Sequence, residues 1–288
     1  MSNVSPEWLA AIQRGRIYDI DSKDPENAVP IVPWIHPPLH PDLQRVILKI
    51  GRKVSLQRLD RLVPVERRIN HLAFVLQGVT ARNFGTPKAG PETDKAAAIS
   101  PPGHVAFGNL NFFTTRPAFG HYFALTKAEI VICEKPLLLP VLRAEPKLLE
   151  LLLKHFESCT LSDRIGLAYM AFASVEQRLK AFVISWAVHY AVPFYKDEAM
   201  WLKMPVPLTR SNRCIVANAS SVSTDNCLKK WKDQDVWIRN GDFVSFPVSF
   251  FEDTYHWMRS SEEQSAYSYT ATLQEFFEKH PDIGSFII

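Results

Sequence analysis

The sequence predicts an α+β fold in which a jelly-roll β-barrel is followed by a long helix and then by a winged helix-turn-helix. Three features predict this order. Short apolar runs between turn residues fill the first half, as in SPPGHVAFGNLNFF at 100–113. A stretch with apolar residues at helical spacing follows at 146–173, and a helix pair with a hairpin lies within 174–250. Glycine and proline supply the backbone angles of tight turns, and short strands between such turns are typical of barrels.

The barrel is expected over residues 42–145. Residues 42–84 are expected to be rich in β-strand, including an apolar strand at 71–79 that ends in a glycine turn. Residues 123–133 predict a strand pair that is broken at a Thr-Lys turn. Small and polar residues at 85–98 predict a mobile loop inserted between barrel strands.

The long helix is expected to start at Pro146, because proline suits a first helical turn. Two series recur at intervals of seven, namely Leu149, Phe156, Asp163 and Met170, and Leu153, Thr160 and Leu167. This spacing is what a two-stranded coiled coil needs, although a helix buried in its own domain is the alternative. Polar residues in mid-seam cost stability, so we expect Asp163 and Arg164 to contact a ligand or to fix the register.

A second amphipathic helix is predicted at 174–192, with Ser174 and Gln177 spaced as a capping box. A proline-containing linker is expected at 193–207 before the last module. Thr209 would cap a first short helix over 211–217.

The turn and second helix of this module also have clear signals. Asn218 stands where the turn needs a left-handed residue, and Ser220 would cap a second helix over 221–232. Two short strands around Asn240 to Asp242 predict a hairpin wing. One departure is that Arg213 and Thr224 occupy positions where the two helices of such a motif usually pack with apolar side chains.

In a winged helix-turn-helix the second helix enters the DNA major groove. Its first exposed positions would contact base edges, and these are Ser221, Val222 and Asn226. Side chains around it would hold phosphates, and these are Thr209, Arg210, Ser220 and Lys229. The expected partner is therefore double-stranded DNA.

Charge and composition are those of an ordinary globular protein, with 47% hydrophobic and 22% charged residues and a net charge of +3. Residues 251–288 carry seven acidic and two basic residues, whereas residues 201–250 carry seven Lys/Arg and four Asp. The mildly basic stretch suits a surface that faces phosphates. The roles of the extensions at 1–41 and 251–288 stay open; the last could fold back or simply form a final helix.

Several classes of function are disfavoured. We expect no membrane span and no secretory signal, which makes a cytoplasmic protein the default. The four cysteines are scattered, so no metal site and no disulfide framework are expected. An enzyme of the cupin kind needs histidines spaced as HxH near a glutamate, and His71, His104 and His121 lack that spacing. Cys214 and Cys227 lie in the DNA module, where packing is favoured over a redox role.

The order of barrel, long helix, helix pair and wing resembles the family of the cyclic-AMP receptor and the fumarate–nitrate regulators, the Crp/Fnr family. The resemblance covers residues 60–250, including HLAFVLQG, PPGHVAFGNLNFF and the ungapped run from Pro146 to Ile238. It implies a homodimeric transcription regulator with a cyclic-nucleotide-binding-like barrel, a dimerisation helix and an inverted-repeat DNA site, and it adds RNA polymerase as a further partner. An effector in the barrel would reorient the DNA helices.

Departures from the family pattern bear on the effector. Cyclic-nucleotide binders have Glu after the barrel glycine, whereas Asn109 follows Gly108, and Arg116 lies out of register with their phosphate-binding arginine. Cyclic AMP is therefore disfavoured. A small aromatic or phenolic acid, as in the halorespiration regulators, is one alternative, and haem held by His104 or His121 is another; for either histidine a surface position is favoured over a ligand. The expected effector residues are Gly108, Asn109, Leu110, Arg116, Asp163 and Arg164.

The second helix of the pair, called here the reader helix, also departs from the family pattern. Ser221, Val222 and Asn226 stand where familiar members have Arg, Glu and Arg. The half-site should therefore differ from the usual one. The competing hypothesis is a barrel-type ligand-binding protein whose degenerate reader helix no longer binds DNA specifically.

Overall fold

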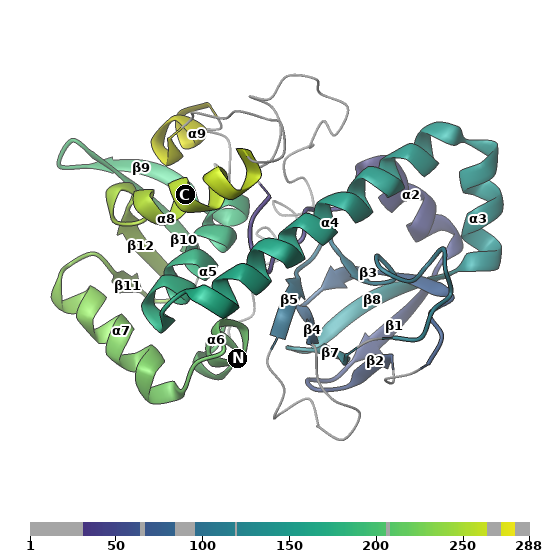
Figure 1. Cartoon of the computed structure of the whole chain (residues 1–288), viewed down its shortest axis with the longest axis horizontal. Coiled ribbons are helices and arrows are strands. Elements are labelled where there is room, and N and C mark those ends of the chain that lie inside the picture. The colour runs from purple at the N-terminus through teal and green to yellow at the C-terminus, as the bar shows by residue number, and fades with distance from the viewer. Residues whose placement is uncertain are drawn as a thin grey trace. The chain divides into compact units, whose positions relative to one another are not determined.

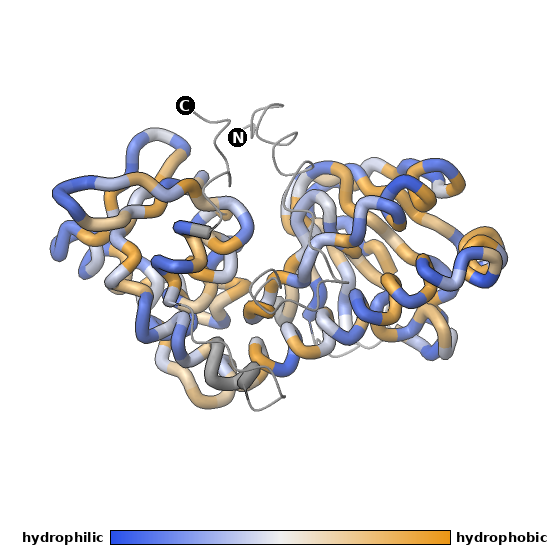
Figure 2. Tube along the Cα trace, turned by 90° about the horizontal axis from the view of Figure 1, so that it is seen from above, coloured by the Kyte–Doolittle hydropathy of each residue, from blue (hydrophilic) through white to orange (hydrophobic). Residues whose placement is uncertain are grey.

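A computed structural model describes residues 31–63, 67–83, 96–118, 120–205, 208–263 and 272–279 of the chain (Figure 1). These residues form two compact units, an N-terminal unit that ends at Leu167 and a C-terminal unit that begins at Ala168. Most of the extension at 1–41 and of the loop expected at 85–98 lies outside the described residues. In Figure 2, hydrophobic segments run through the inside of each unit, and hydrophilic segments lie mainly on outer turns.

In its described residues, the N-terminal unit has two four-stranded antiparallel sheets, β1-β8-β3-β6 and β2-β7-β4-β5, and the helices α2, α3 and α4. Its elements are α2 (Pro41–Ile50), β1 (Arg52–Leu56), β2 (Arg61–Val63), β3 (His71–Gln77), β4 (Thr80–Asn83), β5 (Ala96–Ser100), β6 (Val105–Phe107), β7 (Tyr122–Ala124), β8 (Ala128–Glu134), α3 (Lys135–Ala144) and α4 (Pro146–Phe172). The jelly-roll fold class predicted from turn spacing is confirmed.

Two local expectations for this unit were wrong. Residues 41–50 are helical, not extended, because Pro41 fits a first turn and the His40 ring accepts a hydrogen bond from the Asp42 amide at the helix start. The strands expected as a pair at 123–133 do form, as β7 and β8, but they pair with partners in different sheets. Sequence shows where a strand ends, while its partner depends on tertiary packing.

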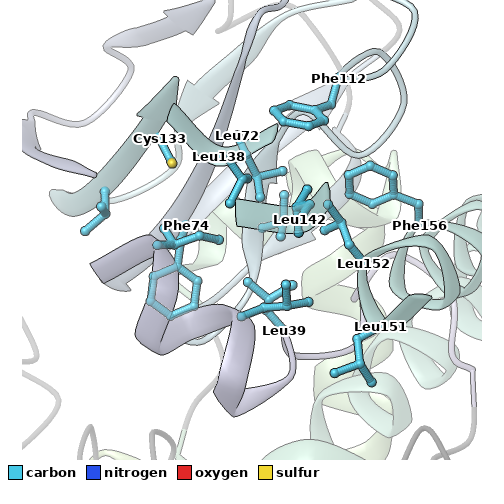
Figure 3. Close-up of a cluster of buried hydrophobic side chains, with 14 residues drawn as sticks. Leu39, Leu72, Phe74, Phe112, Cys133, Leu138, Leu142, Leu151, Leu152 and Phe156 are labelled. Carbon is cyan, nitrogen blue, oxygen red and sulfur yellow. The ribbon is translucent and has the colours of Figure 1, made fainter. Parts of the chain in front are cut away.

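Alternation along β3 builds the core on both faces of one sheet. Ala73 and Val75 point into a cluster shared with the second sheet, whereas Leu72 and Phe74 point to the opposite face. There they pack under the helices, together with buried residues of α2, α3 and α4 (Figure 3). This outer cluster comprises Leu39, Leu43, Ile47, Leu72, Phe74, Val105, Phe112, Val131, Cys133, Leu138, Leu142, Leu151, Leu152 and Phe156. The start of α4 is thereby fixed to the barrel by apolar burial.

Gly108 shows why the glycine in the most informative stretch of sequence is needed. Its φ is +107°, and a Cβ there would lie 2.7 Å from the His71 carbonyl oxygen and 2.9 Å from Leu72 Cδ1. Only glycine fits this close approach of two chain segments.

The C-terminal unit holds two helices of a helix-turn-helix, a four-stranded antiparallel sheet and a helical tail. Beyond the last turn of α4, its elements are α5 (Val175–Tyr190), β9 (Val192–Lys196), β10 (Ala199–Pro205), α6 (Arg210–Ala217), α7 (Ser221–Asp233), β11 (Ile238–Asn240), β12 (Phe243–Pro247), η2 (Val248–Phe250), α8 (Glu252–Glu263) and α9 (Leu273–Lys279). The sheet order is β11-β12-β10-β9.

The linker expected at 193–207 was a wrong prediction, because β9 and β10 form a hairpin there. Its turn places Asp197 and Glu198 at positive φ, which neither residue type signals strongly. The predicted hairpin wing does form as β11 and β12, with β10 extending it through β12.

The described parts of the acidic tail, α8 and α9, pack within the C-terminal unit. Leu273 and Phe277 are fully buried, and the Leu273 amide donates to the Glu252 carboxylate at 2.8 Å. At the junction with α4, the Tyr169 ring lies edge-on to Trp257 of α8, with centroids 4.3 Å apart. Among the described helices, none combines the length and apolar character needed to cross a bilayer.

Candidate functional site

Local capping fixes the helix-turn-helix as the sequence predicts. The Thr209 hydroxyl accepts from the Asn212 amide at 3.3 Å, and the Ser220 hydroxyl accepts from the Ser223 amide at 3.0 Å. Between the helices Asn218 adopts φ 48° and ψ 52°, the left-handed conformation expected for it. Thr209 thus sets where α6 begins, Asn218 where it ends, and Ser220 where α7 begins.

The two polar residues that depart from apolar packing between α6 and α7 are buried and hydrogen-bonded. Arg213 Nη1 donates to the Leu208 carbonyl at 2.8 Å, and the Thr224 hydroxyl donates to the Ser220 carbonyl at 3.0 Å. Cys214 Sγ lies 3.5 Å from the Thr224 hydroxyl oxygen and donates to it. Buried polar groups that find partners are tolerated, so the departure leaves the motif intact.

Helix α5 holds the reader helices in place. Arg178 donates from Nε to the Ala217 carbonyl at 2.8 Å and from Nη2 to the Asn218 carbonyl at 3.2 Å. Glu176 accepts from the indole nitrogen of the fully buried Trp231 at 2.9 Å and from Lys230 Nζ at 2.9 Å. Burial opposes ionisation of Glu176, but these two hydrogen bonds outweigh it and hold its pKa below the usual value. Sequence reasoning missed both anchors.

The residues expected to contact base edges share one exposed face of α7 with Lys229, which is expected to hold a phosphate. Ser221, Val222, Asn226 and Lys229 are all exposed, and Val222 retains 65% of its surface. Their spacing of one, five and eight residues from Ser221 keeps them on one side of a helix.

Arg210 has a partner within the unit that the sequence did not suggest. Its Nε donates to Asp225 Oδ1 at 2.8 Å, and its Nη2 contacts the other carboxylate oxygen. Asp225 stands between Val222 and Asn226 on the same stretch of α7. The wing presents Arg239, which is exposed and donates to the Gly241 carbonyl at 3.1 Å.

Helix α4 has an exposed stripe that follows steps of three and four residues. Its members are Glu150, Leu153, Glu157, Thr160, Arg164 and Leu167. Leu153 and Leu167 keep 49% and 47% of their surface exposed. Of the residues predicted for the seam, Leu153, Thr160 and Leu167 face outward, but Phe156 and Asp163 are buried inside the N-terminal unit and cannot belong to it.

Asp163 is buried within an ionic cluster. His36 Nε2 lies 3.0 Å from Asp163 Oδ1, and Arg82 Nη2 contacts Asp163 Oδ2. Burial opposes ionisation of Asp163, but the charges of His36 and Arg82 outweigh it and hold its pKa below the usual value. Burial lowers the pKa of His36, yet Cys159 and Asp163 raise it to about 10 overall. Asp163 is thus an internal counter-ion, not an exposed seam residue.

This cluster fastens segment 31–40 between the barrel and α4. The Ser162 hydroxyl donates to the Val32 carbonyl at 2.6 Å, and the Ile99 amide donates to the Trp34 carbonyl at 2.6 Å. Trp34 packs so closely on Gly166 that a Cβ there would lie 3.0 Å from the indole Cδ1. A segment expected to be an irregular extension is therefore part of the core.

Two further groups near this cluster, Cys159 and His104, have pKa values far from their ordinary ones. Cys159 Sγ lies 3.4 Å from His155 Nε2. Burial raises the pKa of Cys159, but the charges of His155 and His36 lower it to about 6 overall. His104 is buried with Nδ1 2.9 Å from the Pro102 carbonyl oxygen, and burial lowers its pKa to about 3. The surface position expected for His104 and His121 was wrong, because both are 2% exposed or less.

The six expected effector residues do not share one environment. Asn109 is buried, with no hydrogen-bond partner for its Nδ2 among the described residues, while Leu110 and Arg116 are exposed. Asp163 is buried as described, and its neighbour Arg164 faces outward on the α4 stripe. Among the described residues, no group of three His, Cys, Asp or Glu side chains is placed to hold a metal ion.

Comparison with known proteins shows which solved structures have a similar fold. No protein-family model matches the sequence, and no curated protein matches it. Among solved structures, a cysteine-to-serine variant of CprK complexed with OCPA has a TM-score of 0.56 at 12% identity and covers 79% of this chain and 97% of its own. FixK2 from Bradyrhizobium japonicum has a TM-score of 0.53 at 13% identity, and the match covers 68% of this chain and 92% of FixK2. A cyclic nucleotide-binding domain containing protein from Listeria monocytogenes EGD-e has a TM-score of 0.54 at 14% identity, and the match covers 70% of this chain and 94% of that protein.

The chain has a Crp/Fnr-type fold. The fold resemblance stated from sequence is confirmed, and with it the arrangement of a cyclic-nucleotide-binding domain followed by a helix-turn-helix domain. At 12–14% identity the likeness concerns the fold, so the site residues still have to be argued from their own chemistry.

Proposed function

We propose that this chain is an effector-controlled, homodimeric, DNA-binding transcription regulator. One observation carries the proposal: Ser221, Val222, Asn226 and Lys229 stand exposed on one face of α7 within a helix-turn-helix whose caps and anchors are formed. Such a helix presents its first residues to base edges in the major groove. The Crp/Fnr-type fold supports the proposal, since the structural neighbours are transcription regulators.

We assign base contacts to Ser221, Val222 and Asn226. Asn can bond adenine through both of its amide atoms, and the methyl groups of Val can contact the thymine methyl. Phosphate contacts fall to Lys229 and to the cap residues Thr209 and Ser220, whose hydroxyls lie at helix N-termini where anions are favoured.

Dimerisation uses the exposed stripe of α4. Leu153 and Leu167 are fourteen residues apart with Thr160 between them, which is the repeat of a two-stranded seam. Glu157 and Arg164 flank that seam with opposite charges and would set the alignment of the two helices. Burying the two leucines in both copies supplies the apolar contact that the single chain lacks.

The effector is proposed to be a small organic acid, not a cyclic nucleotide. The solved neighbour CprK is described as complexed with OCPA. In this chain, the buried guanidinium of Arg82 on β4 already binds one carboxylate, that of Asp163 on α4. An acid that competes for Arg82 would loosen α4 from the barrel. Haem held by His104 or His121 is the second candidate; a visible absorption spectrum of the purified chain tests it.

The test of DNA binding is the affinity of the purified full chain for random-sequence duplex at two salt concentrations. Wild-type binding should weaken with salt, and Lys229→Gln should reduce the salt slope by about 1. Lys49→Gln, which removes the same charge from the last turn of α2, is the matched control and should leave the slope unchanged. Salt-insensitive binding, or equal losses in both variants, would refute the reader assignment. Binding that depends on salt but shows no sequence preference would favour the degenerate-reader hypothesis.

Dimerisation is tested separately by sedimentation. Leu153→Glu combined with Leu167→Glu should convert a dimer to a monomer without unfolding it, because both side chains are already half exposed in one chain. Leu137→Glu, on an exposed position of α3, is the control. A dimer that survives the double change would place the interface elsewhere.

A further inference from the structure

Asp225 is an acidic residue in the middle of a surface that is otherwise suited to DNA. It follows Val222 by three residues and precedes Asn226, so it stands on the exposed side of α7. A carboxylate facing DNA is repelled by phosphates unless a cation lies beside it. Arg210 provides that cation through its Nε at 2.8 Å from Oδ1 and a second contact to Oδ2.

Stability does not account for this pair. The side chains of Arg210 and Asp225 keep 57% and 43% of their surface exposed, and exposed ion pairs contribute little. Helices α6 and α7 are already joined by the partly buried contact of Cys214 with Thr224 and are anchored by Arg178. A bidentate ion pair on the exposed face of α7 therefore calls for a functional explanation.

The chemistry of the pair fits base recognition. An ionised carboxylate has about four lone-pair positions, and Arg210 uses one on each oxygen. The hydrogen bond and charge of Arg210 lower the pKa of Asp225, so the carboxylate stays ionised and can only accept. Among the base edges of the major groove, a carboxylate accepts from the exocyclic amine of cytosine.

We propose that Asp225 selects a cytosine in the DNA half-site and that Arg210 is its positioning residue. The guanidinium neutralises the carboxylate toward the phosphates and fixes its plane on the surface of α7. Arg210, expected from the sequence to hold a phosphate, is thereby assigned a different role. This inference rests on the proposed function and deepens it, since it names one base that the reader helix requires.

The experiment is selection of bound sequences from a random duplex pool by the full-length chain. Wild type, Asp225→Asn, Arg210→Gln and the control Asp233→Asn are compared. Asp233 is exposed at the last position of α7, so its variant removes the same charge from the same helix. Circular dichroism and urea unfolding of each variant establish that it is folded.

The wild type should enrich a half-site with a C·G pair at one position. Asp225→Asn should lower the preference for that pair by about tenfold and leave the other positions unchanged, and Arg210→Gln should weaken preference at the same position. Asp233→Asn should match the wild type. These results together would establish the assignment.

Different failures have different meanings. If the wild type enriches a site and Asp225→Asn enriches the same one, the inference is wrong and the proposed function stands. If Arg210→Gln weakens binding to all sequences and lowers the salt slope by about 1, with the cytosine preference intact, Arg210 is a phosphate contact and the positioning role is wrong. If the wild type enriches nothing, the proposed function fails and the inference fails with it.

Discussion

Each unit of this protein contains an Asp–Arg pair, and the two pairs stand in opposite environments. Arg82 and Asp163 are 3% and 10% exposed at the side chain, with His36 as a third member, whereas Arg210 and Asp225 are about half exposed. The buried pair connects β4 to α4 and holds segment 31–40 between them. The exposed pair joins α6 to α7 on the face proposed to contact DNA.

The degree of burial decides what each pair is suited to do. Removing one partner of a buried pair leaves an uncompensated charge in a medium of low dielectric, which is costly. Removing one partner of an exposed pair leaves a charge that water solvates. The first pair therefore supports the folded state, and the second is available for recognition. A graded series of substitutions tests this view.

Asp163→Asn should have the largest effect, a loss of about 3–5 kcal/mol in the free energy of unfolding, because Arg82 and His36 keep their charges without a counter-ion. Urea unfolding measures it. The matched control is Asp233→Asn, the same change at an exposed position at the end of α7, which should matter by no more than about 0.5 kcal/mol. Equal small effects of both variants would contradict a structural role for the cluster.

The second-largest expected effect is the pH dependence of the free energy of unfolding that His104 causes. His104 has a folded-state pKa of about 3 against an ordinary value of 6.5, so the unfolded chain binds a proton first and acid destabilises the fold. Between pH 6.5 and 4.5 this one group should lower the free energy of unfolding by up to about 1.4 kcal/mol per pH unit.

His36 and Cys159 add slope near the upper end of this window and little below about pH 5. His36, with a pKa raised to about 10, is protonated in both states below its ordinary pKa of 6.5, and Cys159 is protonated in both states well below its folded pKa of about 6. His104→Asn should therefore flatten the profile of the free energy of unfolding over this acidic range. A variant that keeps the wild-type slope would show that another group is responsible.

Glu176 is intermediate in both burial and expected effect. Glu176→Ala removes the acceptor of the buried Trp231 indole nitrogen, which should cost about 1–3 kcal/mol in urea unfolding. Lys230→Met removes only the exposed ion pair with Glu176, so it should cost about 1 kcal/mol or less. If both variants cost the same, the indole hydrogen bond is not what anchors α7 to α5.

Asp225→Asn should have the smallest effect on folding, with no shift of the urea midpoint beyond error, because its side chain is exposed. Its effect should appear only in DNA sequence preference. A clear loss of stability in this variant would mean that the exposed pair holds α6 against α7, and the comparison between the two units would fail.

Local signals account for what the sequence predicted well. The capping box at Ser174, the caps at Thr209 and Ser220, and the left-handed Asn218 are formed by residues within a few positions of one another. Turn glycines and alternating apolar residues likewise placed the barrel strands. These features depend on short-range geometry, which one sequence contains in full.

Long-range partners account for what was missed. Asp163 was predicted to face a second helix or a ligand, yet His36 stands 127 residues away in sequence and draws it into the core. The β9–β10 hairpin lacks a turn glycine, so its sequence resembles a linker. Of the DNA face, sequence supplied Ser221, Val222, Asn226 and Lys229, but Asp225 and its pairing with Arg210 emerged only when α6 and α7 were placed side by side.

The central claim is that the exposed face of α7 reads DNA in a dimer. The most direct test is the sequence that the wild-type chain selects from random double-stranded DNA. We expect an inverted repeat, weakened by salt, with a C·G pair in each half-site. A pool with no enriched sequence, or an enriched site without symmetry, would contradict it.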